Sequence, residues 1–149
     1  MKFEIPQAMK AEHDELHNEL VQATKAAGQT GEAAKAVAQV LHAHFVREEE
    51  YALPPLGLLT ALAGGKVEPE MREVLKMTEK LEAELPQMLA EHKQIVAALE
   101  KLIAAAKAEQ HSDVVTFAEK LMLHALAEEQ VAYPTALLIG RYVKARLAA

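Results

Sequence analysis

Apolar residues recur at alternating steps of three and four positions along most of the chain, which is the spacing of one buried helix face. Pro86 falls inside one such stretch, but the apolar stripe keeps its phase across it, so we expect one kinked helix there. Pro54 and Pro134 should each end a helix, because a proline disfavours the helical conformation of the residue before it. The predicted helices span residues 6–27, 32–52, 69–107 and 112–132, followed by a short helix over 135–147.

The connections indicate how these helices are arranged. A short turn over residues 28–31 joins the first two, and a similarly short one joins the last two, so each pair should pack as antiparallel neighbours. The prediction is an all-α fold, an up-down-up-down four-helix bundle with a short C-terminal helix. It forms a single domain over residues 1–149, built from two αα-hairpins at about 6–52 and 69–132. The apolar connection over residues 52–64 should pack over one end of the bundle or lie at a subunit contact.

Six ionisable residues interrupt the apolar stripes. The second and fourth helices each carry a histidine and a glutamate four positions apart, which places both side chains on one helix face. The first and third helices each carry a single histidine on the stripe. Burying such groups is costly unless something compensates them. The six residues are His13, His44, Glu48, His92, His124 and Glu128.

The two hairpins also resemble each other in sequence. The tripeptide Ala11-Glu12-His13 recurs as Ala90-Glu91-His92, at an offset of 79 residues. The two His-x3-Glu pairs are offset by 80 residues, and each has a proline ten positions after its histidine. An internal duplication is the economical interpretation, and a duplicated αα unit predicts a bundle with pseudo-two-fold symmetry.

Four imidazoles and two carboxylates that converge in a bundle core form a nitrogen and oxygen site for first-row transition metals. The symmetry suggests two ions, of which iron is a common choice, although manganese, zinc or a mixed pair would use the same donors. Both glutamates could bridge the ions, leaving two terminal histidines on each ion and open positions for a bridging oxygen and a small exogenous molecule. The alternative is a metal-free polar network, but several uncompensated buried charges would be costly.

Three further residues are candidates for a supporting role. His17 lies one turn after His13 and could be an extra ligand or support one. Tyr51 and Tyr133 lie just beyond the two His-x3-Glu pairs, and either phenol could donate a hydrogen bond at the metal centre. Packing at the end of the bundle is an equal alternative for both tyrosines. The glutamates beside the inward pair are expected on a solvated face: Glu49, Glu50 and Glu129.

Composition narrows the class of protein. A formal charge of −6 argues against a general nucleic-acid surface. The chain has no cysteine, which excludes disulfides and thiolate ligands and fits a reducing cytoplasm. No apolar run follows the N-terminal lysine as in a secretory signal, and the longest apolar stretch is too short to span a bilayer. We therefore expect a cytoplasmic protein that binds neither nucleic acid nor membrane, with its oligomeric state left open.

The order of the six residues resembles the hemerythrin-like, or HHE cation-binding, domain, and the resemblance covers about residues 10–135. It implies an up-down four-helix bundle of hemerythrin-like type that holds a non-haem di-iron centre. The four histidines would then be terminal iron ligands, and the two glutamates would be bridging carboxylates. Oxygen carriers of the family have His-x3-His on the third helix, where this chain has Val96 after His92. Their last carboxylate is an aspartate five residues after its histidine, where this chain has Glu128, four after.

These departures argue against reversible oxygen carriage. The symmetric pattern looks more like bacterial hemerythrin-like proteins linked to nitric oxide, oxidative stress and iron-centre repair. The leading hypothesis is a di-iron protein that binds O2, NO or peroxide for sensing, scavenging or stress protection. One alternative is a di-iron redox enzyme, such as a peroxidase, a nitric oxide reductase or an iron-centre repair protein. Another is a metal-free helical module that binds a partner.

Overall fold

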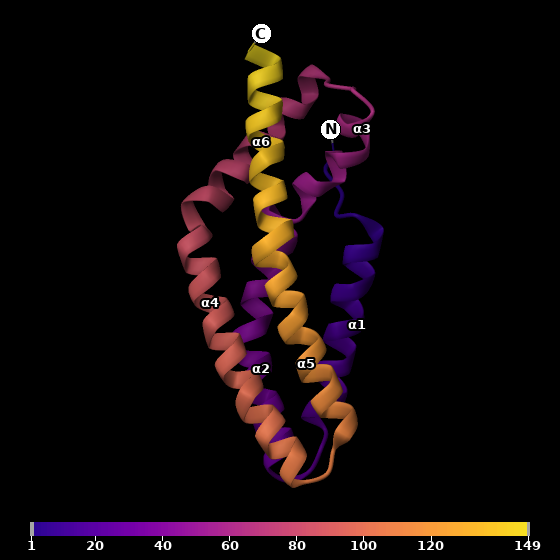
Figure 1. The fold of residues 1–149 in the computed structure, drawn as a ribbon, viewed down its shortest axis with the longest axis vertical. Coiled ribbons are helices and arrows are strands. Elements are labelled where there is room, and N and C mark those ends of the chain that lie inside the picture. The colour runs from indigo at the N-terminus through magenta and orange to yellow at the C-terminus, as the bar shows by residue number, and fades with distance from the viewer. Residues whose placement is uncertain (1, 149) are drawn as a thin grey trace.

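In the computed structural model, which describes residues 2–148, those residues form helices and connections and no strand. The four bundle helices run alternately down and up the long axis of the molecule (Figure 1). Each contacts its neighbours in the order α1, α2, α4, α5 and back to α1. The predicted all-α bundle with up-down-up-down order is confirmed. The helices are α1 (Gln7–Thr24), α2 (Gly28–Arg47), α4 (Val74–Ala108) and α5 (Ser112–Ala127).

The third bundle helix continues through its proline. α4 is one helix with Pro86 inside it, and a 3₁₀ turn, η3 (Pro69–Glu73), leads into it. The buried positions keep their phase across the proline, with Leu81 on one side and Met88 on the other. The prediction of one helix rather than two is confirmed.

Each His-x3-Glu pair is followed by a wide π-helical turn that begins at its glutamate. These turns are η1 (Glu48–Ala52) and η4 (Glu128–Ala132). In both, the N–H five residues after the glutamate donates to the glutamate's carbonyl oxygen, from Leu53 at 2.8 Å in η1 and from Tyr133 in η4. A wide turn brings the residue five positions later back over the glutamate, and such turns are frequent at functional sites.

The fourth helix does not end at Pro134, so that prediction is wrong. A further helix, α6 (Tyr133–Ala148), follows η4 directly, and Figure 1 shows it extending α5 past the end of the bundle. In a regular helix the ring of a proline clashes with the carbonyl four residues earlier. Here the π-helical turn η4 replaces regular α-helix immediately before Pro134, and the chain stays helical.

The first repeat does turn away at its proline, as predicted. After η1 the chain forms a 3₁₀ turn, η2 (Pro54–Leu58), and a short helix, α3 (Leu59–Ala63). Leu53 and Leu56 in this connection are buried in one apolar cluster with Ile139 of α6. The connection therefore packs over one end of the bundle, the first of its two predicted positions.

The turn between α1 and α2 lies over residues 25–27, earlier than predicted, and Gly28 begins α2. Gly28 has a φ of +75°, which favours glycine, and a Cβ on Gly31 would collide with a carbonyl oxygen of the preceding turn. The carboxylate of Glu109, from the α4–α5 turn, accepts hydrogen bonds from the Thr30 N–H at 2.7 Å and from the Thr30 hydroxyl at 2.5 Å. This cap comes from a distant part of the sequence, which is why local patterns misplaced the turn.

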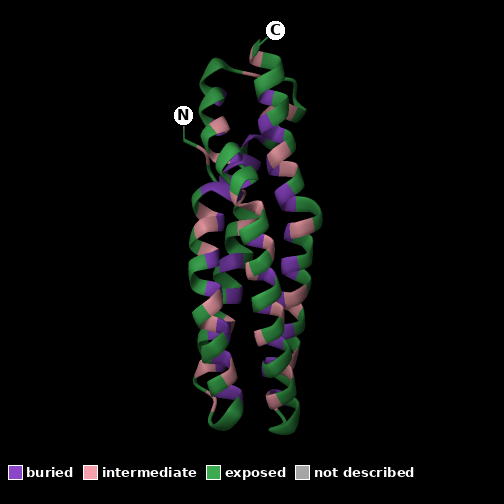
Figure 2. Ribbon diagram, turned by 90° about the vertical axis from the view of Figure 1, so that its left-hand side faces the viewer, coloured by how far each residue is buried: buried purple, intermediate pink, exposed green. Residues whose placement is uncertain are grey.

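Two apolar clusters fill the interior, one toward the interhelical turns and one toward α6. Buried positions line the inward faces of the helices (Figure 2). Along each bundle helix and the turn that follows it, the predicted polar residues separate the two clusters. In α2 and η1, for example, His44 and Glu48 follow Leu41 of one cluster and precede Tyr51 of the other. The six polar residues are therefore enclosed above and below by apolar side chains.

Candidate metal centre

The six predicted residues come together at one level of the bundle, in two groups that share one glutamate. Within each group, one donor atom from every member lies within 4.8 Å of the others. All six side chains are buried, with exposed fractions from 0 % for Glu48 to 8 % for His124. The His44–His92 group contains His44, Glu48, His92 and Glu128, and the His13–His124 group contains His13, His124 and Glu128.

Glu128 connects the two groups. Its Oε1 lies 3.4 Å from Nε2 of His92, and its Oε2 lies 3.4 Å from Nε2 of His13 and 3.2 Å from Nε2 of His124. One carboxylate oxygen therefore faces each group, which is the arrangement a bridging ligand needs. Glu48 belongs only to the His44–His92 group, and its Oε1 lies 3.2 Å from Nε2 of His44.

The two buried carboxylates are electrostatically coupled. Burial and the charge of Glu128 raise the pKa of Glu48 to about 7. The pKa of Glu128 lies well below its usual range, because Glu48 and the neighbouring histidines stabilise its charged form more than burial opposes it. Of the two carboxylates, Glu48 is therefore the one that favours its protonated form, and binding of a cation would favour loss of that proton.

His124, the most exposed of the six residues, also has a shifted pKa. Burial would lower the pKa of His124, but the carboxylates of Glu128 and Glu12 outweigh burial and raise it to about 9. The two carboxylates beside His124 therefore favour a positive charge at this position.

The outer ring nitrogen of each histidine faces a second carboxylate. Such carboxylates fix the orientation and tautomer of histidines that bind metals, and they leave Nε2 free to face the ion. The four pairs through Nδ1 are His44 with Glu91 at 3.1 Å, His92 with Glu129 at 2.9 Å, His13 with Glu49 at 3.6 Å, and His124 with Glu12.

These outer carboxylates follow the sequence repeat. Glu12 and Glu91 each precede a lone histidine, while Glu49 and Glu129 each follow an inward glutamate. The prediction that Glu49 and Glu129 belong to a solvated face is wrong, because both approach a histidine; Glu50 is exposed, as predicted. The repeated Ala-Glu-His and Glu-Glu pairs were the signal for these contacts, since they recur at the same offsets as the buried residues.

Tyr133 lies inside the His44–His92 group. Its hydroxyl donates to Oε2 of Glu48 at 2.8 Å and lies 3.1 Å from Nε2 of His92 and 3.3 Å from Nε2 of His44. Burial and the two glutamates raise the pKa of this phenol. Of the two tyrosines that the sequence singled out, this one belongs to the site.

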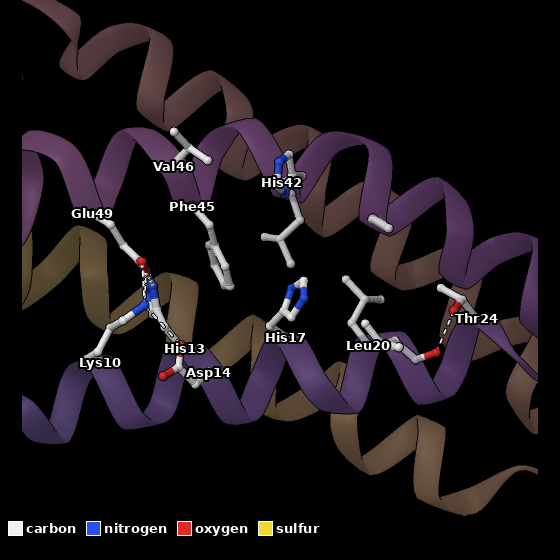
Figure 3. Close-up of a pocket in the computed structure, with 13 residues that line it drawn as sticks. Lys10, His13, Asp14, His17, Leu20, Thr24, His42, Phe45, Val46 and Glu49 are labelled. Carbon is white, nitrogen blue, oxygen red and sulfur yellow. Dashed lines mark hydrogen bonds and ion pairs between the residues drawn. The ribbon is translucent and has the colours of Figure 1, made fainter.

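The other two supporting candidates lie outside both groups. Tyr51 is buried, but its hydroxyl donates to Glu84 at 2.7 Å. His17 is exposed and lines a groove between α1 and α2 (Figure 3). Among residues 2–148, His17 joins no cluster of histidine, aspartate and glutamate side chains that could hold a metal ion.

Two cavities reach the His13–His124 group from the surface. The groove of Figure 3, of about 430 Å³, is lined by His13, whose ring stacks on Phe45 at 4.2 Å between centroids. A second cavity, of about 330 Å³, is bounded by His124 and Glu128 on one side. Its other walls are mainly apolar and include Met9, Leu56, Leu59 and Val131.

The donor set fits a transition-metal cation. Oε1 of Glu48 and Nε2 of His124 are buried without a hydrogen-bond partner, and both belong to the six residues. Unpaired buried polar atoms are uncommon and call for an explanation such as a bound ion. Imidazole and carboxylate donors suit iron, manganese and zinc.

A helical bundle with a buried, shared cluster of histidines and glutamates defines the class of bundle cation-binding proteins. Residues 4–136 match the hemerythrin HHE cation binding domain, and the chain belongs to this family. The resemblance drawn from the six residues is confirmed. Comparison with curated proteins and with solved structures gives no match. Among the described residues, no helix has both the length and the apolar character needed to cross a membrane.

Proposed function

We propose that this protein is a non-haem di-iron protein that binds a small ligand, O2, NO or peroxide, in sensing, scavenging or stress protection. The observation that supports it is the pair of buried groups joined by Glu128, with one carboxylate oxygen directed to each. Two separate clusters with one shared carboxylate suit two neighbouring ions better than one. The absence of cysteine is compatible with a cytoplasmic location, which we include in the proposal.

The number of donors leaves room for a ligand. The His13–His124 group supplies two imidazoles and one carboxylate, which is fewer than the six donors of an octahedral ion. When bound, iron would supply the open coordination position and the electrons for reversible binding or reduction of a small molecule. The protein's residues would hold the ions, orient the imidazoles through the outer carboxylates and enclose the site between the two apolar clusters.

The surroundings of this group suit a small, uncharged molecule. The cavity of about 330 Å³ beside His124 and Glu128 is walled mainly by apolar side chains. A diatomic gas crosses such a wall without losing hydrogen bonds, whereas a charged substrate would pay a desolvation cost. This favours O2 or NO over an ionic metabolite.

The test is metal analysis of the purified protein, with its visible spectrum recorded before and after reduction and then after addition of NO or O2. We expect about two iron ions per chain and a spectrum that changes on ligand addition. Protein that binds no metal would overturn the proposal and leave a metal-free helical module. Consumption of many equivalents of NO or peroxide by the reduced protein would instead identify a redox enzyme at the same site.

A matched pair of variants tests the route to the ions. Ala127 is exposed and lines the cavity beside His124, so Ala127→Trp should fill the cavity and slow NO binding about tenfold or more in stopped-flow mixing. Leu126 is also exposed, 45 % so, and is absent from that cavity's lining, so Leu126→Trp is the control. Both variants should keep the wild-type metal content, and equal binding rates would exclude this route.

A further inference from the structure

We propose that the phenolic oxygen of Tyr133 is a direct ligand of the metal ion held by His44, His92, Glu48 and Glu128. The inference rests on the proposed metal binding and adds to it a fifth protein donor for one ion only. Its consequence is that the two ions would differ chemically by more than the unequal sharing of Glu48 and Glu128 between the two groups.

The distances within the His44–His92 group carry the proposal. Metal–nitrogen and metal–oxygen bonds are about 2.0–2.2 Å long, so adjacent donors at right angles around one ion lie about 3 Å apart. Nε2 of His44 and Nε2 of His92 are 2.8 Å apart. The Tyr133 oxygen lies 3.3 Å and 3.1 Å from these two nitrogens. The phenol therefore stands in the same relation to the two imidazoles as they stand to each other.

The carboxylates complete the same pattern. The Tyr133 oxygen lies 2.8 Å from Oε2 of Glu48, and Oε1 of Glu48 lies 3.2 Å from Nε2 of His44. Oε1 of Glu128 lies 3.4 Å from Nε2 of His92. All of these separations are near the edge length of one coordination polyhedron, with Tyr133 among its corners.

The wide turn η4 explains how Tyr133 reaches this position. The residue is five positions after Glu128, and in a regular α-helix that position points away from the glutamate's face. The π-helical turn brings it back over Glu128, with the Tyr133 N–H bonded to the Glu128 carbonyl. The equivalent residue after η1 is Leu53, which has no donor atom, so the His13–His124 group lacks such a ligand.

A narrower role is conceivable, in which Tyr133 only donates a hydrogen bond to Glu48 and positions it. The two roles differ in the fate of the phenolic proton. Coordination replaces the O–H bond with an oxygen–metal bond and releases the proton to solution, whereas positioning keeps the O–H bond. Only the coordinated phenolate gives a ferric charge-transfer absorption that enhances tyrosine ring vibrations in the Raman spectrum.

The experiment loads metal-free protein with Fe(II) without oxygen, oxidises it, and records the visible and resonance Raman spectra of three proteins. Wild type and Tyr51→Phe should show tyrosine ring vibrations, and Tyr133→Phe should lose them. Tyr51→Phe is the matched control because Tyr51 is equally buried but bonds to Glu84 outside both groups. In chelator competition, Tyr133→Phe should lower the affinity for one of the two ions about tenfold or more and leave the affinity for the other unchanged.

The outcomes separate this inference from the proposed function. Wild-type protein that binds two ions but shows no tyrosine vibrations overturns the ligand role of Tyr133 and leaves metal binding intact. Wild-type protein that binds no metal overturns the proposed function itself. Circular dichroism of metal-free Tyr133→Phe checks that the variant folds. If the variant does not fold, the presence or absence of tyrosine vibrations in the wild-type Raman spectrum still decides whether Tyr133 is a ligand.

Discussion

The two halves of the bundle share their inner residues and differ in what surrounds them. Each half contributes one lone histidine, one His-x3-Glu pair, two outer carboxylates and one wide turn, at offsets of 79 or 80 residues. After the wide turn, however, the first half turns away through η2, whereas the second continues into α6. A set of histidines and glutamates that repeats in sequence therefore sits in an asymmetric protein.

Two pairs of equivalent positions show how the asymmetry reaches the site. Where the first half has Leu53, the second has Tyr133, whose hydroxyl enters the His44–His92 group. Where the first half has Lys10, the second has Leu89. Lys10 bonds Glu49 at 2.7 Å, so Glu49 stays 3.6 Å from its histidine, while Glu129 bonds its histidine at 2.9 Å. The comparison teaches that residues repeated in sequence can have different surroundings, so the two ions of the proposed centre would not be equivalent.

The largest difference is expected between the two inward glutamates. Glu128→Ala removes a donor from both groups, and we expect it to abolish binding of both ions. Glu48→Ala leaves His13, His124 and Glu128 in place, so it should retain one ion per chain. Metal content after gel filtration measures both outcomes. Equal losses in the two variants would show that Glu48 and Glu128 bridge the ions equivalently.

The next largest difference is expected between the outer carboxylates of the two halves, in how much metal affinity each one supports. Glu129→Gln weakens the hydrogen bond that orients His92, and loss of such a partner typically costs about 10–100-fold in metal affinity. Glu49→Gln should cost no more than about threefold, because Glu49 is beyond hydrogen-bond distance of His13. Chelator competition measures both affinities. The exposed Glu50 provides the control variant Glu50→Gln, and similar losses for Glu49→Gln and Glu129→Gln would contradict the difference between the halves.

Helix α6, which has no counterpart in the first half, should contribute to the stability of the fold through its packing on α4. A Cβ on Gly140 of α6 would collide with the side chain of Thr78 on α4, so Gly140→Ala should destabilise the fold by about 1–3 kcal/mol. Thermal unfolding should then occur about 2–12 °C lower. Gly64→Ala is the control, because a Cβ there would make ordinary contacts at 3.5 Å. An unchanged melting temperature for Gly140→Ala would mean that α6 does not dock tightly on α4.

The smallest expected effect concerns the contact by which the second half caps the first. Hydrogen bonds from the Thr30 side chain, and from the backbone of Thr30 and Gln29, lower the pKa of Glu109 from 4.5. Because the folded-state pKa is lowered, this stabilisation is present above pH 4.5 and is lost as pH falls through the lowered value. Glu109→Gln should therefore be less stable than wild type in urea unfolding at pH 7. The difference should shrink at pH 3, and a pH-independent difference would exclude the charged cap.

The sequence predicted the parts of this protein that depend on local periodicity. Buried positions on a helix recur every three or four residues, so the four bundle helices and the inward direction of His44 and Glu48 followed from spacing alone. The continuous α4 helix followed too, because the stripe keeps its phase across Pro86. The family resemblance then depended only on the order of these residues.

What the sequence did not reveal depends on departures from that periodicity or on distant contacts. The wide turn η4 carries the chain through Pro134 and turns Tyr133 inward, and no residue type marks a π-helical turn unambiguously. The carboxylate of Glu109 moved the first interhelical turn by capping α2 from across the bundle. The pairing of the histidines, first helix with fourth and second with third, also required the three-dimensional arrangement.

The two wide turns also carry historical information. If the halves arose by duplication, as their sequence repeat indicates, a turn present at the same position in both belonged to the ancestral hairpin. Tyr133 and Leu53 occupy equivalent places after that turn, so their difference arose later. An ancestral pair of identical hairpins would have held two identical ions. On that history the halves diverged later, and the difference between Leu53 and Tyr133 is the part of the divergence that lies beside the six buried residues.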